Sequence, residues 1–439
     1  MHSRTALHSI CRRCISRRQF STSRNLRQAV QHDLPTTLPP PAGYTHVTNR
    51  ALISLTGRDS TSFLQGLITQ NIVSTPDKPL AAKGGYYAAF LNAQGRVLND
   101  VFIYPSSAPE AGAGSTDPAY LIEVDKAEVT SLMKHLRKHK LRSKLSYRAV
   151  DEGELAVWAV WDEADKTRWT EIAAEISGKN KGPIACVDGR APGFGARVIA
   201  SEDFAASGRG DEFRLPGDKV PFGTYTLRRI LHGIPEGQGE IIRESALPME
   251  YNMDLMSGID FHKGCYVGQE LTIRTHHTGV VRKRILPVQL YGVEDGLPES
   301  DTPLYSPEIK LVLPPAGANI SRVSARKGRS AGKFLAGVGN VGLAMCRLEM
   351  MTDIALTGES TQYNPEQEFR ISWEADGEGA LEGGEVKVKA LVPPWTREFI
   401  MGGAKNGDTP KAQNEVDAEQ ADRGQEVLED IDEEVKHSR

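Results

Sequence analysis

The sequence predicts an α+β protein, with two α+β lobes built on antiparallel sheets and a small β-barrel or sandwich at the C-terminal end. Strand, helix and hairpin patterns occur twice before residue 278, and short strands separated by Gly, Pro and Asp fill most of the rest. No G-x-G-x-x-G follows a first strand and no G-x-x-x-x-G-K-[ST] is present, so dinucleotide-binding and P-loop folds lack a basis. A chain of 439 residues is also too long for one small core, so several domains are expected.

The first lobe is expected at residues 41–150. A β-branched strand that ends at Gly57 is followed by a helix from Ser62, which Asp59 or Ser60 can cap. The next elements are a hairpin around the turn Asn92-Ala93-Gln94-Gly95, a strand at 119–125, and a helix at 127–141 with a basic outer face.

The second lobe is expected at residues 151–277, ending in the loop KGCYVGQE. Its elements are a strand at 155–161, a helix at 167–177, a strand at 195–201 and a helix at 223–234. The barrel is expected at 278–400, with an exposed insertion near 313–332. Its strands are expected at 280–290, 339–351, 369–375 and 386–395.

The two ends of the chain differ in charge. Residues 1–40 are expected to be a mitochondrial transit peptide and a linker, because the first thirty residues hold seven arginines, several Ser and Thr, and no acid. Cleavage after Phe20 removes five arginines and moves the net charge from −4 to −9, which argues against broad nucleic-acid binding. Residues 401–439 are acidic without periodicity, so we expect a disordered tail. No apolar run is long enough to span a bilayer.

Cys265 stands out among the five cysteines, whose odd number and wide spacing favour a reducing compartment over disulfides. Cys11 and Cys14 lie within the expected transit peptide. Cys265 has Lys263, Gly264 and Gly268 as neighbours instead of an apolar run, which is typical of an accessible thiol. A nearby cation lowers a thiol pKa, and Lys263 or His262 is expected to provide it. The alternative is a structural cysteine packed between lobes.

Four motifs carry a family resemblance. LNAQGRVLND, LRRILHGIPE, LPMEYNMDLMSGIDFHKGCYVGQE and GVGNVGLAMCRLEM occur in this order between Thr45 and Trp395. Together they resemble the YgfZ/T-protein-like folate-binding superfamily. The octet Lys263 to Glu270 resembles the signature of the YgfZ branch, whose mitochondrial members are iron–sulfur cluster assembly factors. The resemblance implies a three-lobed, ring-like fold around a central channel, where folate sits in the T-protein relatives.

The resemblance also implies a function. It predicts a factor of the mitochondrial matrix that acts late in the assembly of [4Fe–4S] clusters for enzymes such as aconitase and lipoate synthase. The expected partners are an A-type scaffold protein and the recipient enzymes, with neither a membrane nor direct nucleic-acid contact. Tetrahydrofolate is the expected cofactor. A cluster would be held only transiently through partners, because one cysteine supplies one of about four thiolates.

Asp100 tests the rival function, a tetrahydrofolate-dependent aminomethyltransferase of the glycine cleavage system. In the T-protein relatives an acidic pair at this place contacts folate, but here the pair reads Asn99-Asp100. Aminomethyl transfer needs a placed carboxylate. The missing acid therefore argues against that activity, though not against folate binding, and favours an assembly factor over a catalyst. A strand-end salt bridge is the alternative role of Asp100, and a folate-dependent RNA-modification factor is a third function.

The remaining site residues are drawn from the same motifs. The expected folate-type cavity and loop residues, besides Cys265 and Asp100, are Lys263, Gly264, Tyr266, Gly268, Gln269, Glu270, Arg229 and Glu250. Structural roles stay open for most of them, such as backbone conformation for the glycines, a surface ion pair for Arg229 and a tie between lobes for Glu250. No metal site is expected, because His276 and His277 on a strand would point to opposite faces.

Overall fold

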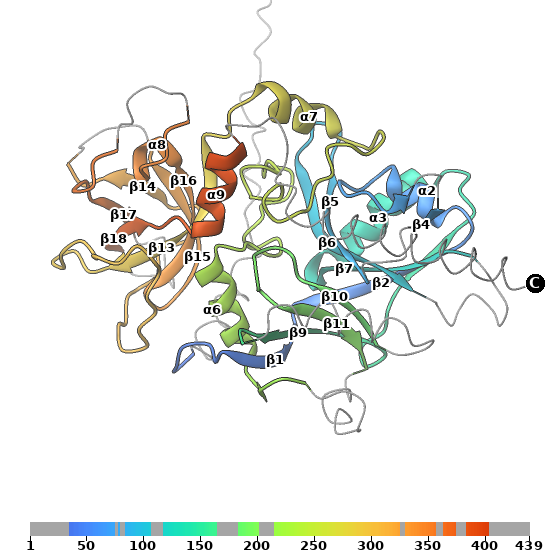
Figure 1. The fold of residues 1–439 in the computed structure, drawn as a ribbon, viewed down its shortest axis with the longest axis horizontal. Helices are drawn as coiled ribbons and strands as arrows, with labels where there is room; N and C mark the ends of the chain where they lie inside the picture. Colours follow the sequence, from blue (N-terminus) through green and yellow to red (C-terminus); the bar gives the residue numbers. More distant parts are fainter. Residues whose placement is uncertain are drawn as a thin grey trace, which may run out of the picture.

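The computed structural model has two facing β-sheets and a separate β-barrel beside them (Figure 1). It describes residues 35–74, 78–79, 84–106, 117–164, 183–201, 215–324, 330–356, 363–374 and 383–403. Residues 1–34 of the expected transit peptide and linker, the helix expected at 167–177 and the part of the expected tail beyond residue 403 lie outside these ranges.

The first sheet has the order β5-β6-β7-β2-β8. Its strands are β5 (Tyr86–Leu91), β6 (Val97–Ser106), β7 (Ala119–Asp125), β2 (Arg50–Thr56) and β8 (Ser146–Ala149), and a short pair, β3 (Val73–Ser74) and β4 (Lys78–Pro79), lies outside it. The predicted hairpin is confirmed, since β5 and β6 pair antiparallel across residues 92–95. Helices α2 (Ser60–Gln65) and α3 (Val129–Lys140), the latter preceded by the 3-10 turn η1 (Lys126–Glu128), bury Leu64, Leu132 and Leu136 against one sheet face.

The capping prediction for α2 was wrong in its mechanism. Asp59 precedes the helix, but its side chain makes no capping hydrogen bond. Its Oδ2 instead accepts the backbone N–H of Lys144 at 2.6 Å, which ties the helix start to the segment after α3.

The second sheet has the order β10-β11-β9-β1-β12. Its strands are β10 (Ile184–Val187), β11 (Ala196–Ala200), β9 (Ala156–Asp162), β1 (Ala42–His46) and β12 (Asp218–Lys219). Strand β1 falls in the range expected for the first lobe, yet it pairs antiparallel with β9, and β12 pairs parallel with β1. The chain therefore starts in the second sheet and crosses to the first at β2.

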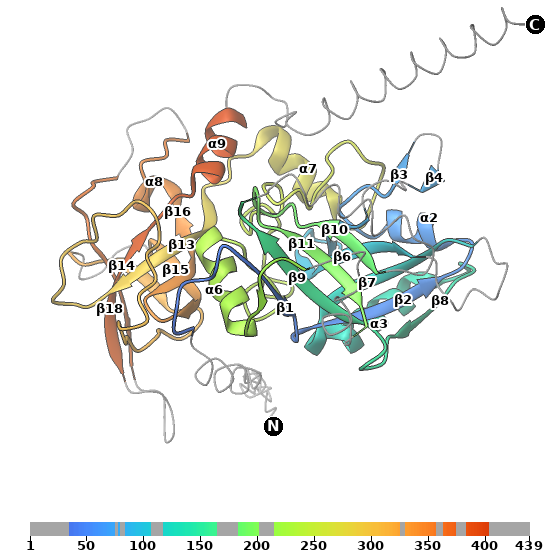
Figure 2. The same ribbon diagram turned by 60° about the horizontal axis from the view of Figure 1, so that its bottom comes forward.

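The barrel is closed, with the order β13-β16-β15-β14-β17-β18. Its elements are β13 (Lys283–Tyr291), β14 (Asn319–Arg322), β15 (Gly332–Val338), β16 (Val341–Arg347), α8 (Leu348–Met351), β17 (Phe369–Trp373), β18 (Gly384–Ala390) and α9 (Pro394–Gly403). The expected insertion at 313–332 contributes β14, whose Ile320 is buried in the barrel core. Helix α6 (Phe222–His232) contacts both β1 and the barrel strands β13, β15 and β16, so it joins the parts (Figure 2).

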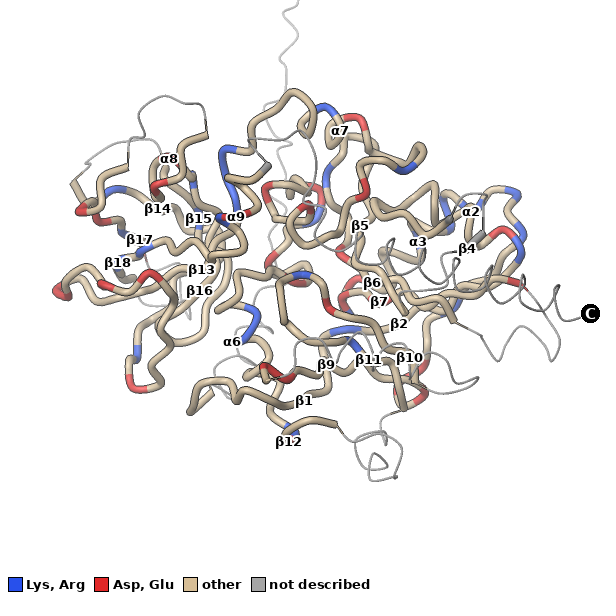
Figure 3. Tube along the Cα trace, in the orientation of Figure 1, with Lys and Arg blue, Asp and Glu red and all other residues tan. Residues whose placement is uncertain are grey.

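A network of buried charges lies where the two sheets meet, and Figure 3 shows Lys, Arg, Asp and Glu segments in the middle of the molecule. Its members are Arg50, Asp100, Glu123, Asp188, Arg190, Arg197, Arg229, Glu236 and Glu240, all buried. Arg50 joins three strands of the first sheet, with Nε 2.9 Å from Glu123 and Nη1 3.1 Å from Asp100. Arg197 of β11 reaches across, because its Nη1 lies 3.4 Å from Glu123 and it also pairs with Glu236.

Glu236 holds this network together from the segment after α6. Its carboxylate accepts from Arg190 Nη1 at 2.8 Å, from Arg197, and from the hydroxyl of Tyr225 at 2.7 Å. Burial alone would raise the pKa of Glu236, but Arg197, Arg190 and Arg229 together hold that pKa well below its usual value. Burying a charge is tolerable only when it is paired in this way.

We predict that Glu236→Gln lowers the free energy of unfolding by about 3–5 kcal/mol, because it leaves buried arginines without their counter-charge. Denaturant unfolding measures this. The control Glu385→Gln, which removes a surface ion pair with Arg370 in the barrel, should lower the free energy of unfolding by less than about 1 kcal/mol.

The difference between wild type and Glu236→Gln should also depend on pH. Because the folded-state pKa is lowered, the contribution of this charge is full above about pH 4.3 and is lost as the pH falls through the lowered value. Equal stability of the two proteins at neutral pH would show that Glu236 does not hold the sheets together.

Candidate functional site

Cys265 lies in the turn before α7 (Gln269–Thr278), and its side chain is exposed. The other described cysteines, Cys186 and Cys346, are buried, and burial raises the pKa of both thiols. Within the described ranges, Cys265 is therefore the thiol that a partner molecule can reach.

Lys263 anchors this turn to the first lobe. Its ammonium donates to the backbone carbonyls of Gln65, Ile68 and Gln70 at 2.8, 2.7 and 2.9 Å. These contacts use all three N–H donors of a lysine, so Lys263 positions the loop through them. Burial lowers the pKa of Lys263 to about 7, and the nearby charge of Asp260 partly opposes this shift. The ammonium also lies 4.9 Å from the ring centroid of Tyr266.

Backbone contacts fix the residues on either side of the thiol. Asp260 Oδ1 accepts the N–H groups of His262 and Lys263 at 2.7 and 3.1 Å. Gln269 Oε1 accepts the N–H of Tyr266 at 3.1 Å, which is the loop-fixing role left open for this residue. Tyr266 is buried, with 6% of its surface exposed, and its packing in the core anchors the turn.

Gly268 packs against the hairpin turn of the first lobe. It has φ +81°, and a Cβ there would lie 2.3 Å from the carbonyl oxygen of Asn92 and 3.2 Å from the Cα of Gly95. A Cβ on Gly95 would in turn lie 2.9 Å from the carbonyl oxygen of Gly268. The motifs LNAQGRVLND and KGCYVGQE, far apart in the sequence, therefore meet backbone to backbone. Gly264 differs, because nothing lies within 4 Å of a Cβ placed there.

The histidine pair belongs to α7, so the expectation of a strand was wrong. His276 stacks on Phe261, with ring centroids 3.7 Å apart, and His277 lies edge-on to it. Burial and the neighbouring His277 lower the pKa of His276. Glu270 is exposed in the first turn of α7, where a negative charge is favourable. Within the described residues, no group of three or more His, Cys, Asp or Glu is placed to hold a metal ion.

Asp100 and Asn99 take part in separate contacts. Asp100 Oδ2 pairs with Arg50, whereas the amide oxygen of Asn99 accepts from Arg243 at 2.8 Å. Asp100 Oδ1 and the hydroxyl of Tyr87 are both buried without a hydrogen-bond partner among the described residues. The two groups interact electrostatically, which raises the pKa of Tyr87 beyond the larger effect of its burial. One acceptor and one donor therefore stand together on the inner face of the first sheet.

Arg229 and Glu250 are engaged elsewhere. Arg229 donates to Glu240 from Nη1 and Nη2 at 2.9 and 3.0 Å, so its carboxylate partner is a residue of its own lobe. Its neighbour Arg228 turns toward Glu163, as expected for adjacent helical residues. Glu250 pairs with Lys283 of β13 at 3.3 Å, the inter-lobe tie that the sequence left open.

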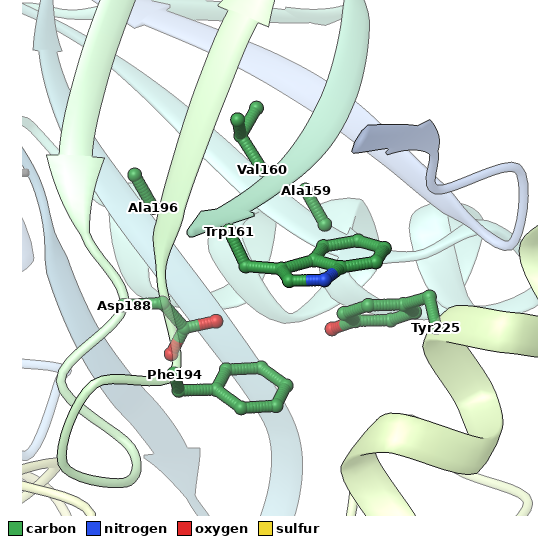
Figure 4. Close-up of a pocket in the computed structure, with 7 residues that line it drawn as sticks. All are labelled: Ala159, Val160, Trp161, Asp188, Phe194, Ala196 and Tyr225. Carbon is green, nitrogen blue, oxygen red and sulfur yellow. The ribbon is translucent and has the colours of Figure 1, made fainter. Parts of the chain in front are cut away.

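A narrow pocket lies beside the charge network (Figure 4). Its walls include the rings of Trp161, Phe194 and Tyr225 and the carboxylate of Asp188. Its interior has no room for a particle the size of a water molecule, so it does not hold a folate. The unpartnered groups of Asp100 and Tyr87, in contrast, fit the polar edge of a pterin ring in their hydrogen-bond chemistry.

The sequence interpretation missed the network that surrounds Asp100. Charged residues inside apolar strands were the available signal, such as Glu123 in AYLIEVD and Arg197 in GARVIAS. A charge on the inward face of a strand indicates a buried partner.

Comparison with known proteins supports the assignment of family and fold. A family model described as "CAF17, C-terminal beta-barrel domain" matches residues 282–398. Relatives named "Iron-sulfur cluster assembly factor IBA57 homolog, mitochondrial" include one from Aspergillus clavatus, 55% identical over 100% of both chains. Another, from Coccidioides immitis, is 56% identical over 97% of this chain and 98% of the relative.

A solved structure is similar in fold. The glycine cleavage system aminomethyltransferase T from Bartonella henselae matches with a TM-score of 0.50 and 13% identity, over 82% of this chain and 87% of that one. At this identity the likeness concerns the fold alone. The predicted fold class, α+β with antiparallel sheets and a C-terminal barrel, is confirmed.

We predict that Gly268→Ala lowers the free energy of unfolding by about 1–3 kcal/mol, because a side chain there is strained and meets the Asn92 carbonyl. The same change should increase the rate of alkylation of Cys265, because the loop would no longer pack against the hairpin turn. Gly264→Ala, four residues away in open space, should change stability by less than about 0.5 kcal/mol. If both variants behaved like wild type, the contact with the hairpin would not be what positions the thiol.

Proposed function

Because the chain belongs to the family of mitochondrial iron–sulfur cluster assembly factors named IBA57 homologs, we propose that it works in mitochondria through the thiol of Cys265. The observation that carries this proposal is an exposed thiol on a loop whose neighbouring residues are anchored to the first lobe. Lys263 fastens one side of the loop and Gly268 the other. The fold thus presents one sulfur ligand at the surface in a fixed place.

The cluster is the cargo of this reaction. An iron–sulfur cluster takes about four thiolates, and Cys265 provides one of them. The others come from a partner, for which an A-type scaffold protein fits, and the cluster then passes to recipient enzymes. We place this step in the matrix, late in the assembly of [4Fe–4S] clusters for enzymes such as aconitase and lipoate synthase.

An assembly role suits Asp100 better than aminomethyl transfer does. Asp100 is paired with Arg50, and Asn99 contributes no second carboxylate. A catalytic carboxylate must be free to accept or stabilise charge during the reaction. The shared fold with the aminomethyltransferase therefore supplies a scaffold for a different function.

The test is complementation of cells that lack this protein. Wild type and Gly264→Ala should restore aconitase activity and protein lipoylation, whereas Cys265→Ser should restore less than about a tenth of either, because a hydroxyl is a poor ligand for iron. Levels of each protein are measured alongside, so that loss of function is separated from loss of protein.

Two results would contradict the proposal. Full rescue by Cys265→Ser would remove the thiol from the mechanism. Normal aconitase and lipoylation in the null cells, with glycine cleavage lost, would instead identify an aminomethyltransferase.

We also propose tetrahydrofolate as a ligand of the inner face of the first sheet. Asp100 Oδ1 and the hydroxyl of Tyr87 would hold the pterin, the first as a hydrogen-bond acceptor and the second as a donor. When bound, the pterin would supply the donors and acceptors that these two buried groups need.

Tyr87→Phe tests this ligand while keeping the ring in place. The affinity for tetrahydrofolate, measured by equilibrium dialysis, should fall by about tenfold, which is the effect of losing one hydrogen bond. Tyr86→Phe is the matched control, because Tyr86 faces the opposite core and its loss should leave binding unchanged. No binding to the wild-type chain, or equal binding to both variants, would exclude this site.

A further inference from the structure

The outer face of α3 and the turn after it form a cationic surface on an acidic protein. Its exposed members are Lys134, Arg137, Lys138, Arg142 and Lys144, with Lys140 half-buried. Positions 134, 137 and 138 share one helix face, opposite the buried Leu132 and Leu136. The chain has no acid from residue 129 to residue 150, although its net charge is −4. We call these six residues the α3 surface.

The charges of the α3 surface are not used within the fold. None of its six side chains forms an ion pair or hydrogen bond with another residue of the described ranges. The acid that comes near is Asp59, which accepts from the backbone N–H of Lys144 and pairs with Arg58. Two other cations of this lobe, Lys126 and Arg148, have acidic partners, Glu152 and Glu154. The α3 surface thus differs from its surroundings in keeping its charge free.

A second observation concerns Leu141, which lies among these cations. It is 88% exposed, the largest exposure among the large hydrophobic residues of the described ranges. Its φ of +42° with ψ −110° is a strained backbone conformation for a leucine, which glycine adopts readily because it has no Cβ. A leucine exposed to water at the end of a basic helix has a cost in free energy, and at 88% exposure little of its side chain packs against the described residues.

The composition of the α3 surface distinguishes among polyanionic partners. Lysine is depleted at protein–protein interfaces, which favour aromatic residues and arginine, yet four of the six cations here are lysines. Single-stranded nucleic acid is held by aromatic rings that stack on bases, and no Phe, Tyr or Trp occurs between residues 129 and 146. Clustered lysines with an exposed aliphatic side chain are typical of proteins that bind the surface of anionic bilayers.

We propose that the α3 surface docks the protein on an anionic membrane surface. The lysines and arginines contact lipid phosphates, and Leu141 enters the boundary between headgroups and acyl chains. The helix is about 18 Å long and lies flat with its cationic side against the bilayer. This contact is peripheral, and no described helix is long and apolar enough to cross a membrane. This membrane contact does not involve Cys265, which lies in the turn before α7 and stays available to a soluble partner.

The experiment is vesicle flotation with the processed chain, purified from mitochondria of a fungal host so that the leader is removed. Vesicles of phosphatidylcholine with about 20% cardiolipin are compared with phosphatidylcholine alone, at about 50 and 300 mM salt. Wild type should float with the cardiolipin vesicles and not with the neutral ones, and high salt should reduce binding. Lys134→Glu combined with Lys138→Glu should reduce binding by about tenfold or more.

Matched controls separate the α3 surface from general charge and hydrophobicity. Lys310→Glu combined with Lys333→Glu changes the net charge equally at exposed barrel positions, and should leave binding within about twofold of wild type. Leu141→Asn, which removes the aliphatic side chain, should weaken binding by about threefold or more even at high salt. The matched control is Leu304→Asn, at a leucine that is 60% exposed near the barrel, and it should leave binding unchanged.

Three results would overturn the proposal. The first is no flotation of wild type with cardiolipin vesicles at low salt. The second is an equal loss in the barrel controls, which would mean that net charge alone decides binding. The third concerns binding of an RNA of about 30 nucleotides, measured by fluorescence anisotropy. If the Lys134 and Lys138 reversal abolished RNA binding and left flotation intact, the α3 surface would be a nucleic-acid surface.

Discussion

Glu236 and the arginines around it are the contact on which the rest of the structure depends. The two sheets of the α+β half face each other, and the residues between them are charged as well as apolar. Arg197 of the second sheet reaches Glu123 of the first, and Glu236 joins Arg197 to Arg190 from the segment behind α6. In a low-dielectric interior, such pairs tolerate little displacement, because separating them leaves a buried charge without a partner. The network therefore fixes the relative position of both sheets and of α6.

This arrangement explains why the centre of the molecule and the candidate thiol have different roles. Asp100 is held in the network by Arg50, which limits its freedom to act as a catalytic base. Cys265, in contrast, lies at the surface on a loop seated against the first lobe by Lys263 and Gly268. A rigid core and a fixed, accessible thiol suit a protein that presents a ligand to a partner better than one that encloses a substrate.

The likeness to an aminomethyltransferase illustrates how one fold can support more than one function. The overall arrangement of sheets and barrel is shared at 13% identity, so the fold survives almost complete replacement of the side chains. In this chain, Asn99 beside Asp100 and the octet around Cys265 are the local features on which its function is argued. Function is decided by residues at the site, and the fold only places them.

The sequence by itself determined the fold class, the hairpin at residues 92–95, most strands of the barrel and the motif that carries Cys265. These depend on local periodicity, turn residues and a contiguous motif, all of which can be read along the chain. Only the tertiary structure decided that β1 joins the second sheet, that Lys263 binds carbonyls of the turn at 65–70, and that Arg229 pairs with Glu240. It also showed His276 and His277 on a helix instead of a strand. Such contacts join residues that the sequence keeps apart, and several partners of suitable charge compete for each of them. Which partner is chosen depends on the distances and burial that packing sets, and a linear pattern does not contain this information.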